Sequence, residues 1–405
     1  MKNIGSQKER VIALIGGANQ TRVRAYNERL VLSMVRRHGS LPKSEISRRS
    51  GLSAQTVSVI MRALEKDGLL LKGKPKRGKV GQPSVPMSLN PEGVYSIGLK
   101  IGRRSADLVL MDFVGGVRNT VHETFPYPTP DRITQFVSNG INTLIETMTE
   151  REQERIVGIG VATPFELWNW AEKVGAPVNS MNSWRNFDLK KQLSEVSGYP
   201  VHVENDATAS CGAELVFGRG AEFTDFVYFF IGYFIGGGVV LKHTVYSGRT
   251  GNAGALGSMP IAHKDGKPQQ LIEKASIFAL ENVLNDKGID PSPLWLTPDD
   301  WGDIGEPLDQ WISSTAKYLA VAIVSSCAVI DFEAAIIDGG FPVSVRKRIV
   351  TEAIREMHKL DLQGIEAPKI IEGLVGSNAR AIGGASVPLF AHYMLDQNVL
   401  FKELN

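Results

Sequence analysis

Residues 41–70 constrain the chain most, because their pattern predicts two short helices joined by a tight turn. The segment reads LPKSEISRRSGLSAQTVSVIMRALEKDGLL. Ser44 is the expected cap of a helix that runs to Ser50, and Gly-Leu at 51–52 supplies the turn. Ser53 is then placed to cap the second helix. The apolar residues of that second helix recur at the spacing of one buried face: Val57, Ile60, Met61 and Leu64.

A helix upstream of this pair completes a three-helix unit. Residues Tyr26–His38 predict a helix that Gly39 ends. The apolar residues of one face of this helix are Leu30, Val31, Met34 and Val35. Helix-turn-helix units lay the second helix of the pair in the major groove of DNA, where Gln, Ser, Thr and Arg side chains read base edges. A three-helix module that binds protein is the alternative interpretation.

The basic stretch after this unit predicts a wing, a flexible hairpin that lays cations along phosphates or into a minor groove. Residues 72–84 read KGKPKRGKVGQPS and hold five basic residues between Lys72 and Lys79. A plain interdomain linker explains the same composition, and both interpretations can hold together. The candidate DNA-binding residues of the helices and the wing are Lys43, Ser44, Ser53, Ala54, Gln55, Thr56, Ser58, Arg62, Lys74, Lys76, Arg77 and Lys79.

Charge is distributed unevenly along the 405 residues. Residues 1–90 hold 18 basic and 5 acidic side chains, a net charge of +13. The remainder holds 27 basic and 38 acidic side chains, a net charge of −11. Cations that neutralise phosphates release counterions, so a basic first fifth on an acidic body favours a nucleic-acid-binding head. A solvated basic face without a partner is the alternative.

The two cysteines and the hydropathy exclude other classes of protein. Cys211 and Cys327 are too few for a disulfide scaffold, and neither has nearby Cys or His residues for a zinc site. The apolar stretch Val11–Gly17 is too short for a signal peptide, and no apolar run approaches the length of a membrane span. We therefore expect a cytoplasmic protein that makes no contact with a membrane.

From about Tyr95 the chain alternates strand-like and helix-like segments, which indicates an α/β architecture. Apolar strands end at glycine turns, a usual place for backbone amides to contact a ligand, although glycine also serves tight packing. These glycine-marked segments are the turn at Gly102, Ile156–Trp170, Tyr228–Lys242 and Ala334–Phe341.

Together with Val201–Gly218 (VHVENDATASCGAELVFG) and Gly251–Pro260 (GNAGALGSMP), these segments resemble the ROK family of sugar kinases and repressors. The head is similar to the winged helix of the family's xylose-repressor-type regulators. The resemblance covers nearly the whole chain past residue 18. It implies an α/β fold in which an N-terminal winged helix-turn-helix domain precedes a two-lobed actin-like ATPase fold of the ROK sugar-kinase type.

The expected boundaries follow from this resemblance. The winged helix-turn-helix domain with its basic wing spans 18–90, and the kinase-like body spans 91–405. Lobe one covers about 91–200 together with a C-terminal helix at about 388–405, and lobe two covers about 201–387.

The resemblance also implies a sugar-binding cleft. Asp206 matches the family's catalytic base, and Asn205 and Asp206 can hydrogen-bond vicinal sugar hydroxyls; capping of the following helix is their alternative role. Glu273 matches a sugar-contacting Glu, with a surface or capping role as the alternative. Trp168, Trp170 and Trp184 can stack on a sugar face, although core packing suits at least one of them. The candidate ligand-binding residues are Asn205, Asp206, Glu273, Trp184 and Gly254.

Other positions depart from the family's kinases. Lys100 stands where the kinases carry an Asp that orders the metal–nucleotide end, and bulky Arg103 and Arg104 occupy a turn that is small and polar in the kinases. Ala255 and Ser258 replace the sugar-binding Glu and the His that contacts sugar and zinc, and the usual zinc cysteines are missing. Phosphoryl transfer depends on positioning and electrostatics. We therefore expect no enzyme activity, no cofactor and no metal, with Asp206 a vestigial base.

The sequence thus predicts a transcriptional repressor of carbohydrate uptake or catabolism genes. It would bind a palindromic operator in double-stranded DNA as a homodimer or homotetramer, under the control of a sugar or polyol effector. A ligand-independent regulator that uses the body only for oligomerisation is one alternative. A sugar kinase with a DNA-binding appendage is the other.

Overall fold

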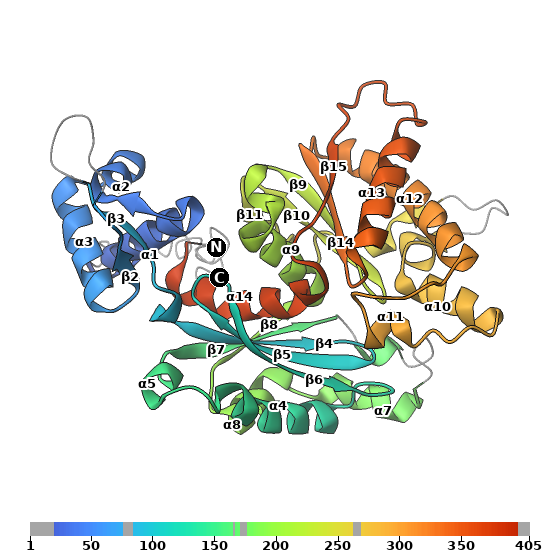
Figure 1. Ribbon diagram of the computed structural model, residues 1–405, viewed down its shortest axis with the longest axis horizontal. Helices are drawn as coiled ribbons and strands as arrows, with labels where there is room; N and C mark the ends of the chain where they lie inside the picture. The colour runs from blue at the N-terminus through green and yellow to red at the C-terminus, as the bar shows by residue number, and fades with distance from the viewer. Residues whose placement is uncertain (1–19, 76–83, 165–166, 171–175, 262–268, 396–405) are drawn as a thin grey trace, which may run out of the picture. The chain divides into compact units, whose positions relative to one another are not determined.

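The computed structural model describes residues 20–75, 84–164, 167–170, 176–261 and 269–395 (Figure 1). These residues divide into two compact units. The head comprises the chain up to Gly93 together with His392–Leu395, and the body comprises Val94–Ala391. The expected boundary near 90 therefore lies close to the observed one, but part of the C-terminal segment belongs to the head.

The head is a winged helix, as the sequence predicted. Helix α1 starts at Gln20, before the expected Tyr26. Its first turns are largely polar and so lack the apolar spacing on which the expectation rested. Gly51, in the left-handed region with φ of 72°, makes the turn between α2 and α3. The strands pair antiparallel in the order β1-β3-β2. The elements are α1 (Gln20–His38), β1 (Leu41–Pro42), α2 (Lys43–Ser50), α3 (Ala54–Lys66), β2 (Leu70–Lys72) and β3 (Pro86–Leu89).

The core of the head forms on the predicted helix faces. The four inward residues predicted for α3 are all buried. In α1 the buried residues are Val31, Leu32 and Val35, whereas Leu30 and Met34 are half-buried. The C-terminal segment adds to this core, since Met394 is buried and the Leu395 backbone N–H donates to Ser33 Oγ at 2.9 Å.

The body contains two lobes whose sheets share one topology. Each sheet places three antiparallel strands beside two parallel ones, in the orders β6-β5-β4-β7-β8 and β11-β10-β9-β14-β15. This repeat is the two-lobed actin-like fold that the resemblance implied. Lobe one's strands are β4 (Tyr95–Ile101), β5 (Ser105–Asp112), β6 (Val117–Thr124), β7 (Ile156–Thr163) and β8 (Val201–Asn205); lobe two's are β9 (Phe226–Ile231), β10 (Ile235–Leu241), β11 (Thr244–Val245), β14 (Ala334–Gly339) and β15 (Lys369–Glu372).

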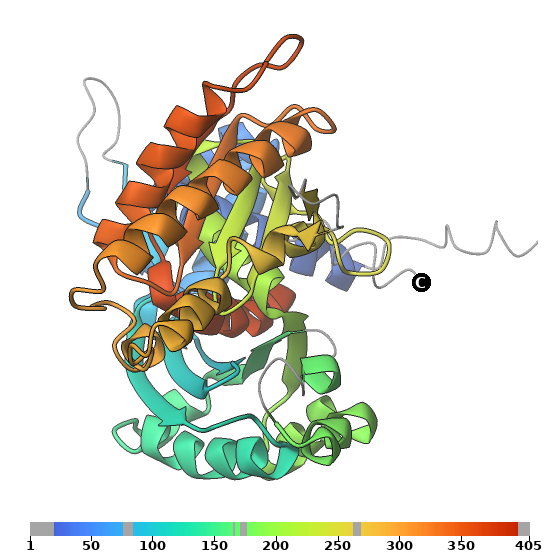
Figure 2. The ribbon, with the colours of Figure 1, turned by 90° about the vertical axis from the view of Figure 1, so that its right-hand side faces the viewer.

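Helices cover both faces of each sheet (Figures 1 and 2). In lobe one, α4 and α8 lie on one face, and α9 and α14 on the other. In lobe two, α12 and α13 pack side by side on one face and α9 lies on the other. The helices of the body are α4 (Pro130–Ile145), α5 (Glu150–Gln153), α7 (Val178–Asn182), α8 (Leu189–Ser197), α9 (Asp206–Phe217), α10 (Ile277–Asp286), α11 (Pro293–Leu296), α12 (Glu306–Cys327), α13 (Val343–Met357) and α14 (Ala379–Tyr393).

Two expected lobe boundaries differ from the structure. Strand β8 pairs with β7, so lobe one continues to Asn205 rather than ending near 200. Helix α14 begins at Ala379, before the expected 388, and packs directly on the sheet of lobe one. A side chain at Gly160 would come within 1.8 Å of the Gly384 carbonyl oxygen, so this close approach requires glycine.

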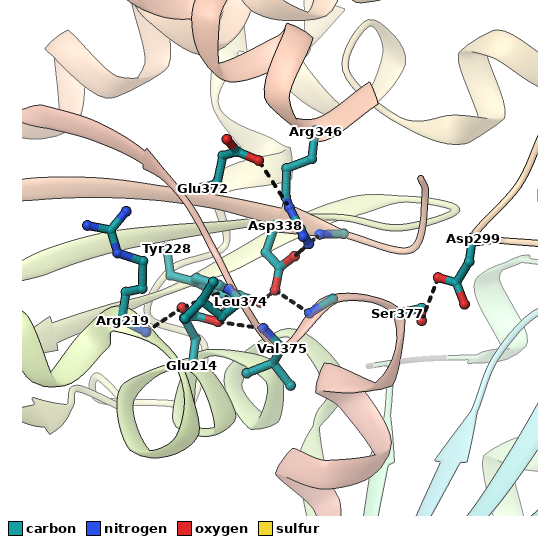
Figure 3. Close-up of polar contacts among 12 residues, drawn as sticks. Glu214, Arg219, Tyr228, Asp299, Asp338, Arg346, Glu372, Leu374, Val375 and Ser377 are labelled. Carbon is teal, nitrogen blue, oxygen red and sulfur yellow. Dashed lines mark hydrogen bonds and ion pairs between the residues drawn. The ribbon is translucent and has the colours of Figure 1, made fainter. Parts of the chain in front are cut away.

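Buried carboxylates fix the loop that leads from β15 into α14 (Figure 3). Glu214 of α9 is fully buried and accepts hydrogen bonds from the backbone N–H groups of Arg219, Leu374 and Val375. Burial raises the pKa of Glu214. Asp338 of β14 accepts from the Gly376 N–H at 2.9 Å and from the Arg346 guanidinium at 2.6 Å.

We predict that Glu214→Ala lowers the free energy of unfolding of the body by about 2–4 kcal/mol, because buried N–H groups would lose their acceptor. Urea denaturation followed by tryptophan fluorescence measures this change. Glu222→Ala is the matched control, because Glu222 is exposed and pairs only with Arg219 among the described residues. Equal stability of the two variants would contradict the capping role.

Candidate functional site

Helix α3 presents the polar face that the sequence predicted for DNA contact. The Ser53 hydroxyl accepts from the Thr56 backbone N–H at 3.1 Å, which confirms the cap. Ala54, Gln55 and Arg62 are exposed. Thr56 and Ser58 are half-buried. Gln55 and Arg62 lie about two helical turns apart, so the exposed residues form a stripe along α3.

The sequence interpretation missed Val59, which lies in this stripe. Its side chain is 52% exposed, between Gln55 one turn before it and Arg62 one turn after it. An apolar side chain in this position suits contact with the thymine methyl group in a major groove. Its spacing from Gln55 was the available signal, but the apolar residue was assigned to neither face.

The residues at the start of α2 lie beside α3. Lys43 Nζ donates to Ser58 Oγ at 3.3 Å, so this cation reaches the predicted DNA face. Ser44 is exposed in the first turn of α2, and its expected role as the cap is wrong. The helix instead begins directly after Pro42, with no side-chain cap.

The predicted wing is described only in part. Strands β2 and β3 pair antiparallel, and Lys74 lies exposed just after β2. Lys76, Arg77 and Lys79 lie outside the described residues.

We predict that Val59→Ala weakens binding to a selected operator severalfold when thymine faces Val59, because the methyl contact is lost. Replacing that thymine with uracil in the DNA should weaken wild-type binding equally and leave the variant unaffected. Fluorescence anisotropy on duplexes recovered by in vitro selection measures both effects. Val23→Ala, at an exposed valine of α1, is the control. Additive losses from the two changes would refute the contact.

Two adjoining cavities lie in the body. The inner cavity of about 230 Å³ is bordered by Asn205, Asp206 and Gly254. The outer cavity of about 360 Å³ is bordered by Lys100, Arg104 and Glu281. Thus three of the five predicted ligand-binding residues border one cavity, at the carboxyl end of β8 and the start of α9.

Of the pair at 205–206, Asn205 has the capping role considered from the sequence, and both residues border the inner cavity. Asn205 Oδ1 accepts from the backbone N–H groups of Ala207 and Thr208 at 3.1 Å, so Asn205 caps α9. Asp206 borders the cavity with one carboxylate oxygen 3.6 Å from Arg380 NH1. Burial raises the pKa of Asp206, and the charge of Arg380 opposes this effect.

The other predicted ligand-binding residues lie elsewhere. Trp184 is buried in the core of lobe one, where its indole N–H donates to the Pro128 carbonyl at 3.1 Å. Glu273 is exposed and accepts from the Gln270 backbone N–H at 3.3 Å. Neither borders the inner cavity, so both positions match the structural alternatives considered for them.

The departures from the kinase pattern cluster at this cleft. Ala255 and Ser258 border the inner cavity. Residues 262–268, which include His263, lie outside the described residues. In the described part of the chain, no three His, Cys, Asp or Glu side chains group to hold a metal ion. No described helix has the length and apolar character to cross a membrane.

Lys100 is buried, and its ammonium group is paired with a neighbouring carboxylate. Its ammonium donates to Ser105 Oγ at 2.7 Å and to Asp107 Oδ2 at 2.8 Å. Burial lowers the pKa of Lys100, and the neighbouring Asp107 opposes this effect. Mg²⁺ needs oxygen ligands, and an ammonium group repels it, so this end of the cleft does not suit a metal–nucleotide complex.

The turn between β4 and β5 reaches across to lobe two. Arg103 and Arg104 both donate to the Glu281 carboxylate of α10, at 2.8 and 3.1 Å. The Arg103 guanidinium lies 4.0 Å from the Tyr233 ring centroid, and that of Arg104 lies 4.4 Å from the Trp295 ring centroid. These contacts join the lobes at the outer cavity.

Comparison with known proteins agrees with this architecture. The family model described as "ROK family" matches residues 96–387, and "Winged helix-turn-helix DNA-binding" matches residues 24–70. A relative from Bacillus spizizenii named xylose repressor is 28% identical over 244 residues, which are 60% of this chain and 62% of that relative. The matched region thus spans less than two thirds of this curated relative.

Solved structures share the fold. One described as a ROK family transcriptional regulator, homolog of E. coli MLC protein, has a TM-score of 0.66 at 20% identity and covers 94% of this chain and 98% of that chain. The ROK family glucokinase from Streptomyces griseus, in complex with glucose and AMPPNP, has a TM-score of 0.56 at 19% identity and covers 72% and 98%. The family match covers most of the body, and the chain belongs to the ROK family.

Proposed function

We propose that this protein is a transcriptional repressor of carbohydrate uptake or catabolism genes, controlled by a sugar or polyol effector in the cleft of the body. The observation that carries the proposal is the exposed stripe of α3, with Gln55 and Arg62 on a helix capped by Ser53. The net charge of +13 on residues 1–90 adds the electrostatic attraction that phosphate contacts need. The name of the Bacillus spizizenii relative, xylose repressor, supports a sugar-linked role.

DNA recognition would divide between two kinds of contact. Gln55 and Val59 would read base edges in the major groove, while Arg62, Lys74 and the wing cations would contact bases or phosphates. A homodimer or homotetramer would present paired heads to a palindromic operator. Half-sites would lie about one or two helical turns apart, because each head must reach the same face of the duplex.

Control would come from an effector that binds one state of the body more tightly than another. Asp206 begins α9 and Asn205 caps it, and α9 contacts both sheets, so a ligand there would bias the closure of the lobes. Closure would change the spacing of the paired heads and hence the affinity for the operator.

We further propose that the body transfers no phosphoryl group. Lys100 pairs with Asp107, and the two arginines of the β4–β5 turn share the carboxylate of Glu281. These groups occupy the end of the cleft where the kinases would hold phosphates and metal. A ligand-independent regulator is the second candidate, because Ala255, which has no polar side-chain atom, and the short Ser258 border the inner cavity where the kinases carry Glu and His.

Genome-wide mapping of bound DNA is the experiment that tests the main proposal. The proposal expects sites beside genes for carbohydrate uptake or catabolism. A protein that binds no discrete sites would contradict it. If sites are found but no sugar, sugar derivative or polyol shifts operator affinity or melting temperature, the ligand-independent candidate replaces it.

We predict that Arg62→Ala and Gln55→Ala affect DNA binding differently. Loss of Arg62 should weaken binding to all duplexes by about tenfold and lower the slope of log affinity against log salt. Gln55→Ala should instead relax the preference at one base pair, by about 1–3 kcal/mol. Anisotropy over a salt series and selection of bound sequences measure these effects. Arg348→Ala, at an exposed arginine of the body, is the charge-matched control; unchanged binding in both head variants would refute the interface.

We predict no ATP-dependent turnover of any sugar above the rate of an Asp206→Asn variant. The physical reason is that Lys100 stands where the kinases carry the Asp that orders the metal–nucleotide complex, and an ammonium group cannot take that role. A coupled ADP-release assay over a sugar panel measures it. Turnover that Asp206→Asn abolishes would establish the kinase alternative.

A further inference from the structure

Buried donors without acceptors converge where the inner and outer cavities adjoin. Four residues border both cavities among those the structure describes: Gly102, Arg103, Tyr233 and Arg380. Arg103 Nε, Arg380 Nε and the Tyr233 hydroxyl are all buried, with no hydrogen-bond partner in the described part of the chain. We call Arg103, Tyr233 and Arg380 the junction.

Arg380 has one carboxylate partner among the described residues. An arginine side chain carries five N–H donors, yet the Arg380 guanidinium meets only the Asp206 carboxylate, at 3.6 Å, and its Nε has no hydrogen-bond partner in the described part of the chain. Its side chain is 16% exposed, with its guanidinium 3.6 Å from Asp206 and 5.2 Å from the Phe230 ring centroid. A cation so enclosed and so poorly bonded costs free energy unless an anion completes its partners.

The charges around the junction leave room for an anion. Arg103 and Arg104 share the single carboxylate of Glu281. Arg380 faces Asp206 at 3.6 Å, so the three arginines Arg103, Arg104 and Arg380 face only two carboxylates among the described residues. Lys100 does not compete for a ligand anion, because Asp107 already holds it.

We propose that the junction binds the carboxylate or phosphate of an anionic sugar derivative, held by Arg380 and Arg103 with the Tyr233 hydroxyl as a further donor. The hydroxyls of the ligand lie in the inner cavity beside Asn205 and Asp206. Arginine suits this role because its planar fork matches carboxylate and phosphate oxygens. This inference rests on the proposed function, and it assigns the effector to sugar acids or sugar phosphates rather than neutral sugars.

The first test compares each neutral sugar with its charged counterparts on the full-length wild-type chain. Isothermal titration at constant ionic strength uses glucose, gluconate and glucose 6-phosphate, then xylose, xylonate and xylose 5-phosphate, and inorganic phosphate alone. We expect at least one anionic sugar to bind ten- to a hundredfold tighter than its neutral parent. Tight binding of the sugar acids identifies a carboxylate ligand, and tight binding of the phosphates identifies a phosphate ligand. Neutral sugars that bind as well as every anion, or no binding by any anion, overturn the proposal.

The second test removes the arginines. Arg380→Gln and Arg103→Gln should each lower the affinity for the anionic sugar at least tenfold more than they lower the affinity for the neutral parent. Arg348→Gln removes one positive charge away from both cavities and should change neither affinity. Melting temperatures identify a variant that fails to fold, in which case the other arginine variant decides. Unchanged anion affinity in a folded variant contradicts the proposal.

The ligand assay contains no DNA, so the two proposals fail separately. Anion binding without operator binding rejects the repressor and keeps the junction. Operator binding without anion binding rejects the junction and keeps the repressor.

Discussion

Two buried carboxylates hold the loop from β15 into α14 in place. The position of α14 in the body follows from the conformation of that loop. Glu214 and Asp338 accept hydrogen bonds from the backbone N–H groups of Leu374, Val375 and Gly376. Because these bonds set where α14 begins, they determine how the helix packs on lobe one and where Arg380 enters the cleft.

The cleft has kept the framework of a kinase fold while its charges have changed. Both lobes retain the five-stranded topology, and α9 still brings Asn205 and Asp206 to an internal cavity. In contrast, the lobe-one turn now holds arginines whose guanidiniums stack on aromatic rings and bond to Glu281. A site organised around cations favours binding of an anion over orientation of a metal–nucleotide complex.

The sequence predicted the head in detail because its helices follow local rules. The Ser53 cap and the inward residues of α3 need only spacing and hydrogen-bonding chemistry. The fold of the body followed from its ordered motifs, through their resemblance to a family. Long-range contacts could not be predicted from the sequence. Glu281, the partner of Arg103, lies far from it along the chain, and so does Pro128, whose carbonyl accepts from the buried Trp184 indole N–H. The capping role predicted for Ser44 was wrong because the sequence pattern locates a helix start only to within one or two residues. The backbone places this start directly after Pro42.

The most direct test of the central claim is the affinity of the full chain for one mapped genomic site, measured by anisotropy against a scrambled duplex at fixed salt, with and without an anionic sugar that binds the chain. The account predicts binding to the mapped site about a thousandfold or more tighter than to the scrambled duplex, and a change in that ratio when the sugar is added. Equal affinity for the two duplexes would contradict it.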